Sequence, residues 1–279
     1  MGLTKLVAKQ NIKGTLIRCP MTVLHAPTSP EIREDQLSAL RAELEGARGE
    51  RGPVLSFGVP EIDRRLANGG LDIGGLHEIA ARSSTLNDDA AATLFTAGAA
   101  SRFAASCGMN VLWIVSQFDL YAPGLEQVGL APDQIIYAQG RSDIEVLASA
   151  EDGLRSRSLG CVVAEIKSAD QTATRRLQLA ASDGQTPMLL YRRHRSRDRS
   201  PLAQPSSAMT RWLIGCLSSE PLPYAGVGRA RWSVELVRQR GGNPFTLDVE
   251  ACDDQGRLAL PAAVADRAAA QVRATNQAA

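Results

Sequence analysis

Residues 57–79 read FGVPEIDRRLANGGLDIGGLHEI, and the chain continues AARSSTLNDDAAATLF to residue 95. The segment Leu76–Ala80 predicts a short strand, and the alanine-rich run Asp88–Ala105 predicts a helix. Nucleotide-binding proteins carry a phosphate-binding loop between such a strand and such a helix, and the loop needs glycines, a lysine and a serine or threonine. No Gly-Lys-Ser/Thr occurs anywhere in the chain. The sequence therefore predicts the framework of a nucleotide site without its phosphate ligands.

Strands and helices alternate through the middle of the chain. Continuous apolar runs, typical of strands buried on both faces, occur at Val111–Val115, Cys161–Ile166 and Met188–Tyr191, with a shorter one at Ile135–Tyr137. Helical spacing of apolar residues between them predicts helices around residues 144–154 and 170–181. We therefore expect an α/β fold, with a mainly parallel sheet flanked by helices. Two later segments, Arg211–Leu217 and Arg229–Arg238, predict antiparallel strands added at the C-terminal side.

Composition excludes several classes of protein. The chain of 279 residues has a formal net charge of +1, so any nucleic-acid surface must be local. Its five cysteines form no CxxC pair and its three histidines show no metal-ligand spacing, so we expect no metal site and a reducing, cytoplasmic location. No apolar stretch approaches the roughly 18 residues of a membrane span, so no membrane association is expected.

Three regions are expected. Residues 1–52 form an N-terminal extension with a leading helix, in which Leu37, Leu40 and Leu44 recur at helical spacing. Residues 53–262 form the core, and residues 263–279 form an alanine-rich tail. Met21 opens a more conventional start, so residues 1–20 are either an extension or the product of a mis-called start codon.

Most of the chain resembles the RecA-type recombinases. The resemblance rests on GGLDIGGLHEI, on LWIVSQFDLYAPGLEQVGL (Leu112–Leu130) and on ARWSVELVRQRGGNPFTLDVE (Ala230–Glu250). It implies a RecA-like core, but two features depart from the pattern. Asn87, Asp88 and Asp89 stand where a lysine and backbone amides would meet a polyphosphate, and Gln117 falls where the catalytic glutamate is expected. An amide cannot act as a general base.

A closer resemblance is to the ImuA family, RecA-related proteins of bacterial mutagenesis cassettes that are sometimes labelled SulA-like. It is carried by GRARWSVELVRQRGG and by the Cys-Asp-Asp-x-Gly-Arg-Leu-Ala-Leu ending, Cys252–Leu260. The resemblance implies a non-catalytic accessory factor of SOS-induced error-prone translesion DNA synthesis, without a cofactor. Its implied partners are ImuB and an error-prone C-family DNA polymerase, with RecA as a further candidate. Two alternatives stay open: a RecA-paralogue DNA-dependent ATPase with an unconventional nucleotide loop, and a SulA-like cell-division inhibitor.

A run of arginines follows the strand Met188–Tyr191 and is the main candidate binding site. Its members are Arg192, Arg193, Arg195, Arg197 and Arg199. Placed on a mobile loop, they would contact DNA phosphates or an acidic partner protein. The alternative is a solvated loop whose charge serves only solubility. Glu165, at the end of a strand, stands where RecA-like proteins place a magnesium-supporting aspartate, and we expect a structural role for it.

Overall fold

The computed structural model describes residues 52–194, 196, 199–219, 222 and 224–261. The predicted leading helix and the tail from residue 263 lie outside the described residues. The description below therefore concerns the predicted core.

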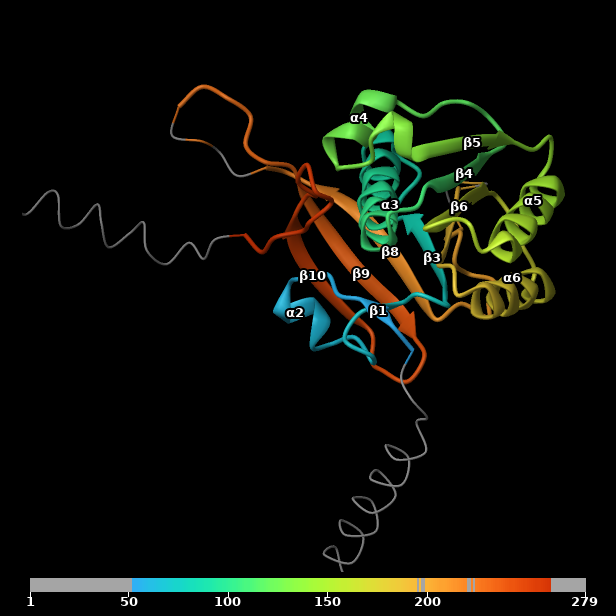
Figure 1. Cartoon of the computed structure of the whole chain (residues 1–279). Coiled ribbons are helices and arrows are strands. Elements are labelled where there is room, and N and C mark those ends of the chain that lie inside the picture. The colour runs from blue at the N-terminus through green and yellow to red at the C-terminus, as the bar shows by residue number, and fades with distance from the viewer. Residues whose placement is uncertain (1–51, 195, 197–198, 220–221, 223, 262–279) are drawn as a thin grey trace, which may run out of the picture. The chain divides into compact units, whose positions relative to one another are not determined.

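An eight-stranded sheet in the order β10-β9-β8-β3-β7-β6-β4-β5 forms the centre of the core (Figure 1). Every pairing from β8 across to β5 is parallel, whereas β8, β9 and β10 pair antiparallel. This confirms the predicted α/β fold class, a mainly parallel sheet flanked by helices with antiparallel strands added at the C-terminal side. The strands are β3 (Leu76–Ala81), β4 (Val111–Val115), β5 (Ile135–Gln139), β6 (Cys161–Ile166), β7 (Met188–Arg192), β8 (Thr210–Leu217), β9 (Arg231–Gln239) and β10 (Phe245–Glu250).

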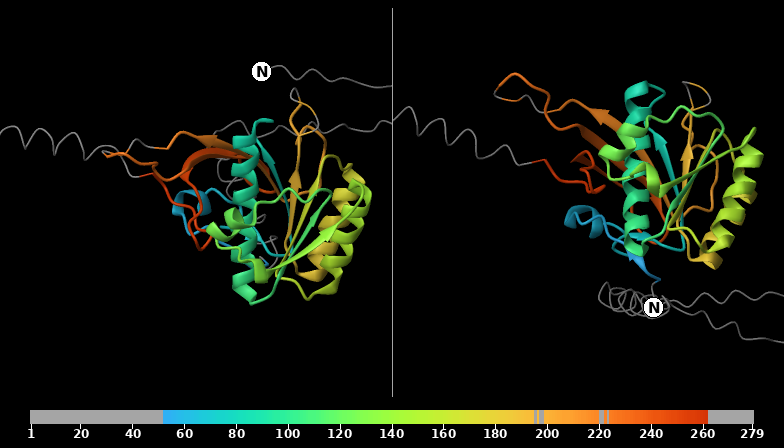
Figure 2. Two further views of the ribbon diagram at one scale, coloured as in Figure 1. Left: turned by 90° about the horizontal axis from the view of Figure 1, so that it is seen from above. Right: turned by 45° about the horizontal axis from the view of Figure 1, so that its top comes forward.

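Helices cover both faces of the sheet (Figure 2). One face carries the long helix α3 (Leu86–Cys107) with the short α4 (Ala122–Gln127). The other carries α5 (Asp143–Ser156) and α6 (Gln171–Gly184), which pack side by side. Smaller elements complete the core: β1 (Val54–Leu55) pairs with β2 (Leu71–Asp72), α2 spans Pro60–Asp63, and the 3-10 helix η1 spans Pro132–Gln134.

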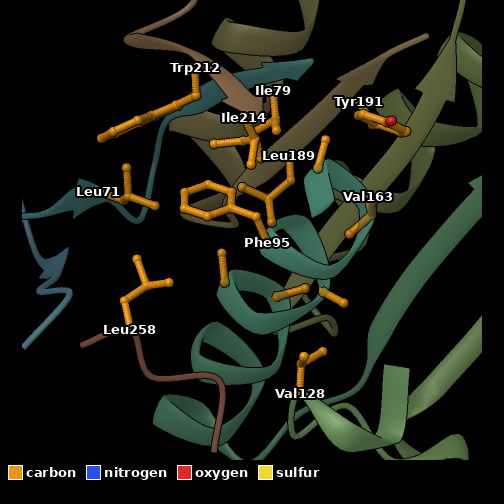
Figure 3. Close-up of a cluster of buried hydrophobic side chains, with 14 of the residues drawn as sticks. Leu71, Ile79, Phe95, Val128, Val163, Leu189, Tyr191, Trp212, Ile214 and Leu258 are labelled. Carbon is orange, nitrogen blue, oxygen red and sulfur yellow. The ribbon is translucent and has the colours of Figure 1, made fainter. Parts of the chain in front are cut away.

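Alternation along the strands divides the buried side chains between two apolar layers. Trp113 and Val163 belong to the layer under α3, whereas Ile114 and Val162 belong to the layer under α5 and α6. On the α3 side, Phe95 lies among Ile79, Leu189, Trp212 and Ile214 (Figure 3). Its ring centroid is 6.0 Å from that of Trp212. Trp212 and Trp232 are both buried.

The C-terminal motif Cys252–Leu260 packs against α3. Asp253 Oδ1 accepts hydrogen bonds from the backbone amides of Gln255 and Arg257, each at 2.9 Å, which closes a tight turn. Gly256 in this turn has φ +69°, and a Cβ there would lie 2.5 Å from the carbonyl oxygen of Gly98 in α3. Only glycine fits both the backbone angle and the close approach.

The predicted strands and helices are found with small shifts at their ends. The helix expected at Asp88–Ala105 begins at Leu86, because Thr85 caps it and accepts a hydrogen bond from the Asp88 amide. The strand expected to end at Tyr191 continues through Arg192. The strand expected at Arg229–Arg238 is β9, which begins at Arg231.

Replacing Trp212 by alanine removes an aromatic contact between the sheet and Phe95. We expect Trp212→Ala to lower the free energy of unfolding by about 3–5 kcal/mol, as for other buried aromatic truncations. Val227→Ala is the control, because Val227 is 91% exposed. Urea unfolding of the two variants should separate them clearly; equal midpoints would contradict the packing described.

His77 in β3 predicts a pH dependence of stability. Its Nε2 lies 2.9 Å from the carbonyl oxygen of Asp72, which can only accept, so Nε2 carries the proton. Its Nδ1 then accepts from the hydroxyl of Thr210, 2.8 Å away. Burial lowers the pKa of His77 below 6.5, and the Asp72 carbonyl opposes the shift.

Below pH 6.5, His77 becomes protonated in the unfolded chain but stays neutral in the folded protein until a lower pH, because its pKa is lowered there. Stability from this group is therefore complete above that pH and is lost as pH falls, by up to about 1.4 kcal/mol per pH unit. Unfolding measured from pH 7.5 to 5.5 should show a shallower slope for His77→Gln than for the unchanged protein. Identical slopes would show that His77 does not titrate in this way.

Candidate functional site

A cavity of about 290 Å³ lies at the carboxyl ends of the parallel strands, where the phosphate-binding loop is expected. Ser84, Thr85 and Leu86 line one side, between β3 and α3. Gln117 lies on the opposite side, after β4. Crevices outside the carboxyl ends of parallel strands are the usual ligand sites of such sheets. The position is therefore that of a nucleotide site, and its lining decides what it can bind.

The loop that should cradle phosphate is closed by its own side chains. Asp88, in the first turn of α3, accepts a hydrogen bond from the Ser83 hydroxyl at 2.5 Å through Oδ2. Its Oδ1 accepts from the backbone amide of Cys216 in β8 at 2.7 Å. Asp88 and Asp89 also place negative charge at the positive end of the helix dipole, which favours the helix and disfavours an incoming anion.

Arg193 occupies the centre of the site. Its Nε lies 2.6 Å from Glu165 Oε2, its NH1 lies 3.1 Å from Asp89 Oδ2, and its NH2 lies 3.0 Å from Asp119 Oδ1. These residues come from four separate segments: the residue after β7, strand β6, helix α3 and the loop after β4. We call Arg193, Glu165, Asp89 and Asp119 the Arg193 cage. A side chain of the protein thus supplies the positive charge of the site.

Two aromatic side chains support the cage from beneath. Trp113 donates from Nε1 to Glu165 Oε1 at 2.7 Å, so both oxygens of that carboxylate are used. Tyr191 donates from its hydroxyl to Asp89 Oδ1 at 2.5 Å, and its ring lies 5.4 Å from the Arg193 guanidinium carbon. A cation stacked on an aromatic ring and bonded to carboxylates is fixed in position.

The cage changes the acidity of its members. Burial raises the pKa of Glu165, and the neighbouring Arg193 and Trp113 oppose the shift. Burial acts to lower the pKa of Arg193, but attraction to Glu165 and Asp89 outweighs it and the pKa is raised. Burial and the Asp89 carboxylate raise the pKa of Tyr191, so its hydroxyl stays protonated and remains a donor.

Arg192 points to the opposite face of the sheet. Its NH1 lies 2.9 Å from Glu78 Oε1, and Arg211 Nε lies 2.6 Å from Glu78 Oε2. The Glu78 side chain is 0% exposed, and the Arg192 side chain is 2% exposed. Consecutive arginines therefore serve ion clusters on opposite faces of the sheet, the Glu78 cluster buried and the Arg193 cage partly exposed.

The structure places the five arginines of the predicted binding site as follows. Arg192 and Arg193 belong to the strand end and to the cage, and ion pairs inside the protein occupy them. They are not on a free loop, because buried carboxylates attract them. Arg199 is exposed, and Arg195 and Arg197 lie outside the described residues. Binding of DNA or of a partner protein by the arginine run stays a prediction.

The sequence interpretation missed the cage and the Glu78 cluster, although a signal existed. Glu78 and Glu165 each stand inside an apolar strand, in Leu76–Ala81 and Cys161–Ile166. A carboxylate buried in such a strand requires a positive partner. The partners, Arg192 and Arg193, lie 114 and 28 residues away.

Comparison with known proteins supports the resemblance seen in the sequence. No protein-family model matches the chain. The chain is 37% identical over 197 residues to Protein ImuA of Caulobacter vibrioides, in strain NA1000 / CB15N and in strain ATCC 19089 / CIP 103742 / CB 15. The match covers 69% of this chain and 81% of the Caulobacter protein. The chain belongs to the ImuA family. A search of solved structures finds a crystal structure of the RadB recombinase, at 15% identity and TM-score 0.49, covering 74% of this chain and 98% of that one.

Two further features concern the described part of this ImuA-family chain, membrane-spanning helices and metal sites. No helix there is long and apolar enough to span a membrane. No group of three or more His, Cys, Asp or Glu side chains in the same residues is arranged to hold a metal ion.

Removing Arg193 should destabilise the fold. Arg193→Met leaves Glu165 buried without its cation, and we expect a loss of about 2–4 kcal/mol in the free energy of unfolding. Adding Glu165→Gln should recover part of that loss, because the unpaired charge is removed. Arg82→Ala is the matched control: Arg82 pairs with Glu235 at 3.2 Å in an exposed bridge, worth about 0–1 kcal/mol. Equal denaturation midpoints for Arg193→Met and Arg82→Ala would contradict a structural role for the cage.

Proposed function

We propose that this ImuA-family protein is a non-catalytic accessory factor of SOS-induced error-prone translesion DNA synthesis. It acts as an adaptor in a mutasome with ImuB and an error-prone C-family DNA polymerase, in the cytoplasm. The Arg193 cage is the observation that supports the absence of catalysis. Membership of the ImuA family supports the role in mutagenesis.

The charges of the cavity oppose a nucleoside triphosphate. Phosphoryl transfer depends on cations that bind the phosphates and neutralise developing charge. Here three carboxylates surround one guanidinium, so the cage carries an excess of negative charge. A polyphosphate would have to break the bonds of Arg193 and leave Glu165 without its cation. The single positive charge of Lys167, which also lines the cavity, does not offset the loss of these bonds.

The general base expected after β4 is also missing. Gln117 lines the cavity at the position of the expected glutamate, and its amide cannot take a proton from water. Both Glu165 oxygens accept hydrogen bonds, from Trp113 and Arg193. A carboxylate so committed is not free to activate water.

One observation favours a second candidate function, a DNA-dependent ATPase with an unconventional nucleotide loop. The cavity of about 290 Å³ persists at the expected place, and Lys167 borders it. Under this alternative Arg193 would swing out when nucleotide binds. The two functions differ in a direct assay.

We expect no ATP hydrolysis above a buffer control, with or without single-stranded DNA. Loss of a phosphate cation and of a general base each removes about 10²-fold or more in rate. Hydrolysis would be followed by phosphate release, and nucleotide binding by calorimetric titration with magnesium-ATP. DNA-stimulated turnover that Asp89→Ala abolishes would favour the ATPase.

The adaptor role predicts that this protein brings ImuB and the polymerase together. Size-exclusion chromatography of the three purified proteins should show one complex, and ImuB and the polymerase should associate less when this protein is omitted. RecA is a further candidate partner, to be added in a parallel run. A full-length protein that retains neither ImuB nor the polymerase would refute the adaptor role.

A further inference from the structure

Three aromatic side chains are exposed on neighbouring segments at one end of the sheet. Phe118 and Tyr121 lie between β4 and α4, and Tyr137 lies in β5, the outermost strand on that side (Figure 1). The three side chains are 61%, 73% and 38% exposed, in that order. The rings of Phe118 and Tyr137 meet edge to face, with 6.3 Å between their centroids. We call these three residues the aromatic surface.

The loop that carries two of these rings is anchored to the core. Asp119 Oδ1 lies 3.0 Å from Arg193 NH2, so the Arg193 cage holds this loop from one side. The next side chain, Leu120, packs against the apolar layer under α3. The ring of Tyr121 then lies close to Gly124 in α4, where a Cβ would be 3.2 Å from Tyr121 Cδ1. The exposed rings therefore stand on a fixed backbone, and little conformational entropy is lost when a partner covers them.

Exposed rings in contact with one another are typical of a binding surface. Single exposed apolar side chains are ordinary on the surface of a folded protein. Adjoining ones expose a contiguous apolar patch, and aromatic residues are enriched in the buried centres of protein interfaces. Packing within the chain leaves most of Phe118 and Tyr121 exposed. The aromatic surface therefore favours a partner that supplies apolar side chains.

The charge of this part of the chain is of one sign. Residues 103–140, which include the aromatic surface, contain three carboxylates and no lysine, arginine or histidine. Asp119 is paired with Arg193. Glu126 in α4 and Asp133 in η1 are exposed, and neither forms an ion pair within the described residues. The segment that joins the aromatic loop to β5 is therefore acidic, and it complements positive charge on a partner.

This charge distinguishes between two classes of partner. Single-stranded DNA also stacks on aromatic rings, but its phosphates require a basic groove beside them. Residues 103–140 offer no cation, and their free carboxylates repel phosphate. A protein segment with apolar and basic side chains meets both the rings and the charge.

We propose that the aromatic surface docks a segment of a partner protein in which lysine or arginine side chains are interspersed among apolar ones. The apolar side chains cover Phe118, Tyr121 and Tyr137. The basic side chains face Glu126 and Asp133. The proposal does not depend on the adaptor role, since it identifies the partner by chemistry alone.

The test begins with a phage-displayed library of random dodecapeptides, selected on the full chain. The library is first depleted on a double variant, Phe118→Ser with Tyr121→Ser, so that only peptides that need the aromatic surface remain. Enriched peptides should combine apolar residues with lysine or arginine. Failure to enrich any peptide, or enrichment of acidic peptides, would overturn the proposal.

Calorimetric titration of one synthetic enriched peptide then measures the contribution of the rings. The double variant at Phe118 and Tyr121 should bind at least about tenfold more weakly, because aromatic side chains dominate the binding energy of interfaces. The matched control is Tyr224→Ser with Val227→Ser, which removes two apolar side chains that are also exposed. Both variants should unfold at the temperature of the unchanged protein. Equal affinities of the two double variants would contradict docking at the aromatic surface.

The charge contribution is measured with the same peptide. Its affinity should fall as salt is added, because salt screens exposed charges. Glu126→Gln with Asp133→Asn should weaken binding and reduce this salt dependence, and an unchanged affinity would overturn the charge argument and with it the predicted basic partner. A labelled single-stranded oligonucleotide is titrated in parallel. Binding of the oligonucleotide that is lost in the Phe118→Ser, Tyr121→Ser variant would identify DNA as the ligand and overturn the proposal of a protein partner.

Discussion

The contact between Arg193 and Glu165 holds together the carboxyl end of the sheet. Parallel strands end there, and the backbone pairing stops soon after bonds such as that from Arg193 N to Ile166 O at 2.8 Å. In a nucleotide-binding protein, phosphates and a metal ion would join the loops that follow. Here a guanidinium joins β6, β7 and α3 through bonds to Glu165 and Asp89, and reaches Asp119 beyond β4. The arrangement of these loops therefore depends on the guanidinium of Arg193, a cation supplied by the chain itself.

The alternation of a β-strand explains how two neighbouring residues serve two clusters. Successive side chains of a strand point to opposite faces, so Arg192 and the following Arg193 diverge. Arg192 joins Glu78 on the side of α5 and α6, and Arg193 joins the cage on the side of α3. Glu165 stands in a strand whose other residues are apolar, and Glu78 stands in a strand whose one other polar residue is His77. Each buried carboxylate therefore requires a nearby arginine. The pair at the end of β7 therefore sets the charge of both faces.

The sequence predicts most of this fold and little of its charge arrangement. Val111–Val115 and Cys161–Ile166 are apolar throughout, and such runs form central parallel strands whatever their distant partners are. The changed nucleotide loop can also be recognised from the sequence, because the absence of its lysine is visible there. Ion pairing is different, because Arg193 could equally lie on a solvated loop until β6 and β7 are known to be neighbours. The sequence therefore predicts a single arginine surface, whereas Arg192 and Arg193 form ion pairs on opposite faces of the sheet.

The occupied centre of the site has a consequence for reversibility. Restoring a lysine in the loop after β3 would bring a second cation next to Arg193, with Asp88 still tied to Ser83 and Cys216. Removing Arg193 first would leave Glu165 buried without its cation and weaken the fold. Clearing Arg193 from the site therefore passes through a less stable protein. The Arg193 cage opposes a return to nucleotide binding, because the stability of the fold depends on the ion pairs that occupy the site.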